Sequence, residues 1–152
     1  MAVRGTQTRP LPSPLVLMLS LAHKEPLRLV VRERSQIETV MRLLSYERGI
    51  IGYDTEDTGW KPGISPVGRA RNVSFQLGGD NWQAAIDWRF LGDFSKWLAD
   101  EVAKKAVTNE KFERHVLANH GLVLRGVVID TAYASFTYNP LRKGRHGLKQ
   151  CL

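Results

Sequence analysis

The chain has 152 residues, with 22 lysines and arginines against 15 aspartates and glutamates, and a formal net charge of +7. This length predicts one globular core. The single cysteine, Cys151, excludes both an internal disulfide scaffold and a cysteine-based zinc site. The excess of positive charge favours an anionic partner such as nucleic acid.

The first 25 residues predict a basic, proline-rich leader ahead of the folded domain. Arg4 and Arg9 precede an apolar stretch from Leu15 to Ala22, which faintly resembles a secretion signal. This stretch is far shorter than the roughly 18–20 residues that a membrane-spanning helix needs. We therefore expect a flexible leader over residues 1–25, a domain over residues 26–152, and no membrane partner.

The next segment predicts a strand, a helix and a second strand. Apolar residues alternate over Leu27–Val31, as in a strand with one buried face. Ser35 predicts a helix N-cap, Glu38 completes a capping box, and apolar residues at helical spacing predict a helix over 36–47. The apolar run that begins at Ile50 ends in acidic residues, which is typical of a buried central strand.

The rest of the chain predicts strands that alternate with helices. After a loop rich in glycine and proline, the expected elements are strands over 72–77 and 82–87, a helix over 92–105, a strand over 106–108, a helix over 110–120 that ends at Gly121, a strand over 127–129 and a short helix over 131–138. This order predicts the α/β class, with a mixed sheet of about five strands flanked by helices.

Asp54 and Glu56 are the first candidate functional residues. Residues i and i+2 of a strand point to the same side, so both carboxylates are expected on one face at the end of a buried strand. Such neighbours repel each other unless a cation neutralises them, and hard oxygen ligands suit Mg²⁺ or Mn²⁺. Taken alone, this D-x-E pair is more typical of a solvated acidic strand end than of a metal site.

A second candidate segment opens the helix over 110–120. Asn109 is expected to cap this helix, and Glu113 lies one turn in. Taken alone, this pattern is typical of an ordinary helix whose first-turn acids are favoured by the helix dipole.

Together the two segments resemble the 3′–5′ exonuclease domain of family A, polymerase I-like DNA polymerases. The stretch LRLVVRERSQIETVMRLLSYERGIIGYDTED is similar to the start of that domain and its D-x-E motif, and TNEKFERHVLANHGLVLRGVVIDTAYAS is similar to the second motif and its sequel. The resemblance covers about residues 27–152. It implies a ribonuclease H-like fold of the DEDD exonuclease superfamily, whose four carboxylates bind two divalent metal ions.

The resemblance also implies roles for individual residues. Asp54 would bridge two Mg²⁺ or Mn²⁺ ions, Glu56 would bind one and orient the attacking water, and Glu113 takes the position of the third carboxylate. Thr55 is implied to contact the terminal nucleotide, and Asn109 is a further candidate nucleic-acid contact. The basic tail could contact phosphates or form a solvated terminus; its candidate residues are Arg142, Lys143 and Arg145.

Two departures from the family pattern leave the function open. Glu113 stands where the family has Asp, and the third motif, which supplies the fourth carboxylate, is not reached by residue 152. The domain is therefore expected to be C-terminally incomplete. The main hypothesis is a two-metal exonuclease that acts on single-stranded DNA 3′ ends in replication or proofreading. The alternative is a non-catalytic nucleic-acid-binding or structural module.

The resemblance suggests two candidate protein partners. They are a polymerase domain and a separately encoded C-terminal fragment, the latter if the chain is one part of a split or truncated polymerase. The expected location is the cytoplasm of a bacterial or phage-infected cell.

Overall fold

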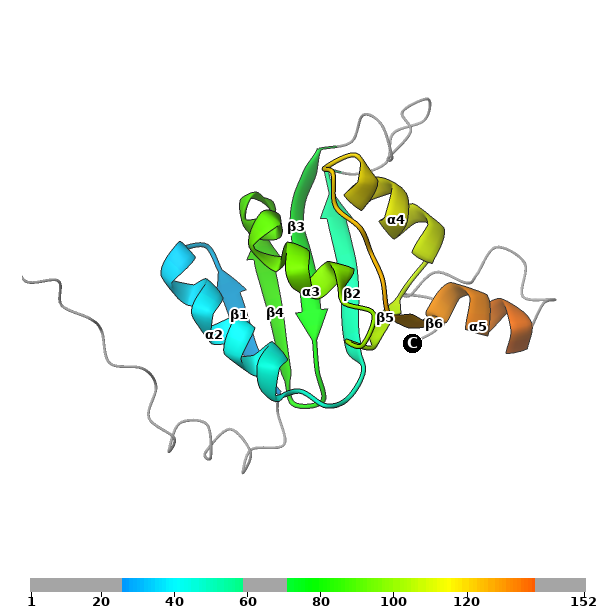
Figure 1. The fold of residues 1–152 in the computed structure, drawn as a ribbon, viewed down its shortest axis with the longest axis horizontal. Coiled ribbons are helices and arrows are strands. Elements are labelled where there is room, and N and C mark those ends of the chain that lie inside the picture. The colour runs from blue at the N-terminus through cyan, green and yellow to red at the C-terminus, as the bar shows by residue number, and fades with distance from the viewer. Residues whose placement is uncertain (1–25, 59–70, 139–152) are drawn as a thin grey trace, which may run out of the picture.

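The computed structural model describes residues 26–58 and 71–138, which form a six-stranded mixed sheet and its helices (Figure 1). The elements in chain order are β1 (Leu27–Val31), α2 (Arg34–Tyr46), β2 (Ile51–Asp57), β3 (Asn72–Gly78), β4 (Trp82–Asp87), η1 (Trp88–Phe94), α3 (Ser95–Ala99), β5 (Lys105–Val107), α4 (Glu110–Ala118), β6 (Val127–Asp130) and α5 (Thr131–Tyr138). The predicted α/β class is confirmed, and each of the six predicted strand segments forms a strand of the sheet. The predicted leader lies outside the described residues.

The strand order is β1-β4-β3-β2-β5-β6. The strand β3 is antiparallel to both of its neighbours, whereas β1 is parallel to β4, and β2, β5 and β6 are parallel to one another. The carboxyl ends of β2, β5 and β6 therefore meet at one edge of the sheet, where α4 and α5 also begin. Ligands of α/β sheets commonly bind at such an edge.

The hydrophobic core lies between one face of the sheet and the helices. Alternate residues of the strands are buried on this face. The elements α2, η1, α3 and α4, and the loop after α4, add apolar side chains to it. The largest fully buried apolar side chains are those of Phe75, Phe94, Leu77, Ile86, Leu98, Leu117 and Leu124. This arrangement follows from the period-2 pattern of the strands, which directs one set of side chains toward the helices. Within the described ranges, no helix is long and apolar enough to cross a membrane.

The predicted start of α2 is wrong by two residues. The helix begins at Arg34 with Glu33 as its N-cap, and Ser35 lies inside the first turn. The Gln36 side chain accepts hydrogen bonds from the backbone amides of Arg32 and Glu33, at 2.8 and 3.0 Å. Glu33 and Gln36 have the same spacing as Ser35 and Glu38, and they lie nearer to the end of β1, so the earlier pair defines the helix start.

The predicted helix over 92–105 is also wrong. A 3₁₀ segment, η1, runs from Trp88 to Phe94, and α3 ends at Ala99. Phe94 and Leu98 are buried as expected, but Val102 is 86% exposed, so no apolar side chain continues the buried stripe. The Lys105 side chain also donates to the carbonyl oxygens of Asp100 and Ala103, which holds this segment as a loop.

Candidate functional site

Asp54 and Glu56 lie in the second half of β2, near the sheet edge where the parallel strands end. Gln76 of β3 is the register partner of Asp54, and its side-chain amide donates to Glu56 Oε1 at 3.2 Å. The two carboxylates therefore share the sheet face that carries Gln76, as the alternation of the strand predicts. Glu56 is exposed, whereas Asp54 is half-buried.

Glu113 reaches β2 from α4 and is 1% exposed. Its Oε1 atom accepts hydrogen bonds from the Thr55 hydroxyl at 3.2 Å and from the Thr55 amide at 3.4 Å, across 58 residues of sequence. Its Oε2 atom is buried and has no hydrogen-bond partner in the part of the chain that the structure describes. An unpaired buried carboxylate oxygen is costly, so this atom marks a place where a ligand would be stabilising.

The start of α4 sets the position of Glu113. Asn109 has a left-handed backbone, with φ 62°, and its side chain accepts a hydrogen bond from the Phe112 amide at 3.3 Å. The predicted N-cap is therefore confirmed, and the Asn109 side chain is engaged within the chain. Phe112 itself is half-buried.

The electrostatics of the cluster disfavour negative charge. Burial, together with the neighbouring Glu56 carboxylate, raises the pKa of Asp54 to about 6, against a lowering by the Thr55 amide. Burial likewise raises the pKa of Glu113 to about 8, although the Thr55 hydrogen bond opposes this effect. Both Asp54 and Glu56 add to the rise at Glu113, so the three carboxylates are close enough to repel one another.

Asp54, Glu56 and Glu113 are chemically suited to bind a divalent cation. They offer hard carboxylate oxygens, and a cation would relieve both their repulsion and the unpaired Glu113 Oε2. Among the described residues, no three acidic, histidine or cysteine side chains already converge as a metal-holding group. Mg²⁺ does not need such a cage, because it is commonly held by one or two carboxylates, waters and substrate phosphates.

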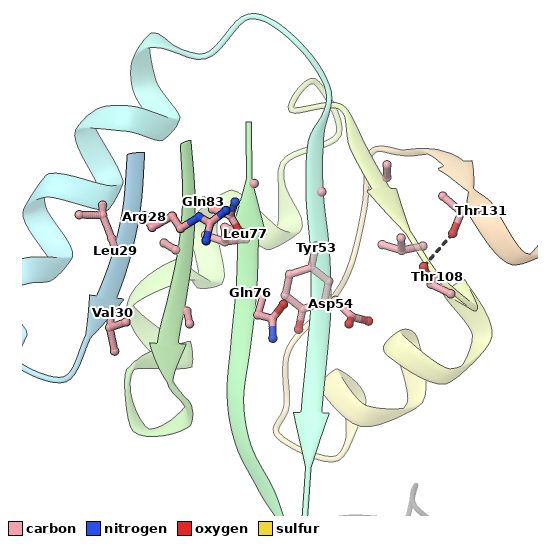
Figure 2. A pocket seen from close by; sticks show the side chains of 16 residues that line it. Arg28, Leu29, Val30, Tyr53, Asp54, Gln76, Leu77, Gln83, Thr108 and Thr131 are labelled. Carbon is pink, nitrogen blue, oxygen red and sulfur yellow. Dashed lines mark hydrogen bonds between the residues drawn. The ribbon is translucent and has the colours of Figure 1, made fainter. Parts of the chain in front are cut away.

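A shallow hollow lies on the sheet face that the core helices leave open. It has a volume of about 430 Å³ and extends from β1 to β5. Figure 2 shows Asp54 at this hollow, together with Thr108 and Thr131, whose hydroxyl oxygens are 2.7 Å apart. The hollow thus leads across the sheet to the carboxylate cluster.

Other predicted site residues have different outcomes. Thr55 lies at the cluster, but its amide and hydroxyl are directed to Glu113. The three basic candidates of the tail, Arg142, Lys143 and Arg145, lie outside the described residues. Asp130, at the end of β6, was not singled out as a site residue. It accepts hydrogen bonds from the first amides of both α4 and α5. Its position directly before the predicted helix over 131–138 is the sequence signal that indicates a helix-capping residue.

No family model matches the sequence. A DNA polymerase I from Synechocystis sp. is 46% identical over 43 residues, which are 28% of this chain and 4% of that protein. The structure of the POL domain of Pol1 from M. smegmatis, in complex with DNA primer-template and dNTP, is similar with a TM-score of 0.57 and 24% identity over 73% of this chain.

Two further solved structures are similar to this fold. One is Trypanosoma brucei RNase D in complex with RNA U12, with a TM-score of 0.61 and 18% identity over 79% of this chain. The other is Brucella melitensis NrnC with bound Mg²⁺, with a TM-score of 0.54 and 23% identity over 83% of this chain. This chain spans 19%, 43% and 58% of the Pol1, RNase D and NrnC chains, respectively.

These similarities define the class of fold. The protein has a ribonuclease H-like fold of the kind seen in exonuclease domains. The sheet, the D-x-E strand and the helix that carries Glu113 occur in the order that the resemblance implied.

Proposed function

We propose that this chain is a nuclease domain that hydrolyses phosphodiester bonds at nucleic-acid 3′ ends with divalent metal ions. The observation that carries the proposal is the buried Oε2 atom of Glu113, which has no hydrogen-bond partner among the described residues and lies within electrostatic range of the carboxylates of Asp54 and Glu56. The exonuclease-like fold supports it, as do solved neighbours that hold DNA, RNA and Mg²⁺.

Asp54, Glu56 and Glu113 would hold Mg²⁺ or Mn²⁺, two ions by resemblance to the family. When bound, such ions supply activation of a water molecule and stabilisation of the leaving 3′ oxygen. Thr55 fixes one oxygen of Glu113 and leaves the other for a ligand. Because burial and mutual repulsion raise the pKa values of Asp54 and Glu113, both carboxyls would release protons when a cation binds.

The proposed substrate is a single-stranded DNA 3′ end, in replication or proofreading. The net charge of +7 supports an anionic substrate, and the basic tail supplies candidate phosphate contacts. A polymerase domain or a separately encoded C-terminal fragment is the proposed protein partner.

A non-catalytic nucleic-acid-binding module is the second candidate. Two observations favour it: Glu113 replaces the Asp of the family pattern, and the described residues hold no complete metal-binding group. In that case the fold would retain nucleic-acid binding without cleavage.

Release of mononucleotides from a 3′-labelled single-stranded oligonucleotide separates the two candidates. With Mn²⁺ or Mg²⁺, the full chain should release label from DNA, and Asp54→Ala should reduce the rate by about 100-fold or more. Glu101→Gln is the matched control, because Glu101 is an exposed partner of Arg125. Retained binding without any release would support the module, and an RNA substrate in parallel tests the preference for DNA.

A further inference from the structure

Asp130 caps two helices with one carboxylate. Its Oδ1 atom accepts from the Asn109 amide at 3.1 Å, and its Oδ2 atom accepts from the Glu110 amide at 2.7 Å, both at the start of α4. At the start of α5, Oδ1 also accepts from the amides of Ala132 and Tyr133, at 2.9 and 3.2 Å. The first amides of a helix have no partner within it, and the helix dipole favours an anion there.

A second contact joins the same two strand–helix junctions. The hydroxyl groups of Thr108 and Thr131 form a hydrogen bond of 2.7 Å, which Figure 2 shows as a dashed line. Thr108 follows β5 and precedes α4, whereas Thr131 is the first residue of α5. The start of α4 is therefore tied to the end of β6 by a carboxylate and by a hydroxyl pair.

The start of α4 needs such support. Asn109 adopts a left-handed conformation, which is unfavourable for a residue with a side chain. Asp130 holds the Asn109 and Glu110 amides, and Glu113 follows within the first turn of the same helix. A shift of this turn would move Glu113 away from Thr55 of β2.

We propose that Asp130 is a positioning residue, which fixes the start of α4 so that Glu113 reaches Thr55 and the carboxylate cluster of β2. Its consequence for metal binding rests on the proposed function, whereas its consequence for the position of Glu113 does not. Residues that orient metal ligands from outside commonly change metal affinity or activity by about 10- to 100-fold when they are replaced.

The two oxygens of Asp130 explain why this position needs a carboxylate. Burial raises the pKa of Asp130, but its hydrogen bonds from four backbone amides outweigh that effect and lower it overall, so the group is ionised at neutral pH. An asparagine would offer one carbonyl oxygen, and its amide nitrogen would face the hydrogen of a backbone N–H group. If the carbonyl oxygen takes the place of Oδ1, Asp130→Asn leaves the Glu110 amide at the start of α4 without its acceptor. If it takes the place of Oδ2, the amides of Asn109, Ala132 and Tyr133 lose theirs.

Amide hydrogen exchange, measured by NMR on the metal-free full chain, tests the position of Glu113. In Asp130→Asn, the amides of Glu113 and Thr55 should exchange about 10-fold faster, while that of Phe75 in the core stays unchanged. Uniform acceleration that includes Phe75 would mean general destabilisation and would overturn the proposal. The matched control is Asp87→Asn, because Asp87 caps a different helical segment, η1, through the Arg89 amide.

Calorimetric titration with Mn²⁺ alone tests the link to metal binding. Asp130→Asn should weaken binding by about 10- to 100-fold, and Asp87→Asn should leave it within twofold. If the unaltered chain neither binds Mn²⁺ nor cleaves, the proposed function fails, while the exchange of Glu113 and Thr55 still decides the positioning role.

Unchanged exchange at both amides in Asp130→Asn overturns the positioning role. If that variant does not fold, Thr108→Val removes only the hydroxyl pair. It should accelerate the same two amides to a smaller extent, and no change would again overturn the proposal.

Discussion

Lys105 and Glu113 are two fully buried ionisable residues, and they differ in how well their polar atoms are hydrogen-bonded. Lys105 lies at the start of β5, where its Nζ atom donates to the carbonyl oxygens of Asp100 and Ala103, each at 2.9 Å. The ammonium also lies 4.7 Å from the centre of the Trp97 ring. Glu113, at the other end of the parallel strands, keeps one buried oxygen without a partner among the described residues.

The difference separates a structural charge from a candidate ligand. Burying a charge is costly unless hydrogen bonds and opposite charges compensate it. The buried ammonium of Lys105 is compensated by two carbonyl oxygens of the same chain, and these hydrogen bonds also hold the loop between α3 and β5 in place. Glu113 finds no such compensation among the described residues, and without a cation its carboxyl keeps its proton up to about pH 8. A divalent cation has the right charge and the right affinity for oxygen to replace that proton.

The largest effect on stability is expected at Lys105. Lys105→Met should lower the free energy of unfolding by about 3 kcal/mol, because the Asp100 and Ala103 carbonyls lose their donor inside the core. Urea denaturation measures this change. Lys104→Met, at the exposed neighbouring position, is the control and should stay within about 0.5 kcal/mol of the unaltered protein. Equal effects at both positions would contradict the structural role of Lys105.

Glu113→Gln should have the opposite sign. Without added cations at pH 8, we expect it to raise the free energy of unfolding by roughly 2 kcal/mol, because a neutral amide avoids the cost of a buried carboxylate. The variant should also lose the rise in melting temperature that Mg²⁺ produces in the unaltered chain.

Glu110→Gln is the matched control for Glu113→Gln. It removes an ion pair with Arg114 on the same helix and should destabilise by less than about 1 kcal/mol. A Glu113→Gln variant that is less stable than the unaltered chain would show that the carboxylate is already compensated.

The pH dependence should place the minimum of stability near pH 8. The pKa of Glu113 is about 8 in the folded protein against an ordinary 4.5, so the folded state holds more protons and stability falls as the pH rises between these values. The pKa of Asp54, raised to about 6, acts in the same direction. The pKa of Lys105 is lowered by burial to about 8 from 10.5, so the unfolded state holds more protons and stability rises over that interval.

Urea denaturation from about pH 5 to 10 without divalent cations measures both slopes, which we expect to amount to about 5 kcal/mol on the acidic side and about 2 kcal/mol on the basic side. Glu113→Gln should flatten the acidic slope alone, and Lys105→Met the basic slope alone. A single slope that neither variant changes would contradict the assignment to these two groups.

The smallest effect is expected at Tyr53, which lies between the two sites. Its ring is 6.4 Å from that of Trp97, and its buried hydroxyl has no hydrogen-bond partner among the described residues. The pKa of Tyr53 is raised by burial and by the nearby carboxylates Glu113 and Asp54. Tyr53→Phe should therefore be neutral or stabilise by up to about 1 kcal/mol, as measured by thermal unfolding. Tyr46→Phe, at an exposed position, is the control, and a loss above about 1 kcal/mol in Tyr53→Phe alone would reveal a partner of the hydroxyl.

Reasoning from local patterns predicted the strands well and the helix ends poorly. The bounds of β1 and β4 agree with the prediction, because alternation with one buried face is a strong local signal. The helix predicted over 110–120 ends earlier, at Ala118 with Asn119 as its C-cap, although Gly121, where the helix end was expected, does have a left-handed backbone. Ser35 was mistaken for the N-cap because two capping pairs of equal spacing overlap, and the position of β1 selects the earlier one. The helix predicted over 92–105 ends early, at Ala99, because the Lys105 side chain donates hydrogen bonds to the carbonyl oxygens of the segment that follows α3.

The sequence by itself determined the α/β class, the order of the elements, and the placement of Asp54 and Glu56 on one face of a strand. These properties depend on residue periodicity and on motifs of a few positions. Only the tertiary structure decided that Glu113 meets Thr55, that its second oxygen is buried with no partner in residues 26–58 and 71–138, and that Asp130 accepts hydrogen bonds from the start of the helix that carries Glu113. The reason is that burial, and with it the pKa of a carboxyl group, depends on which distant segments exclude water from it.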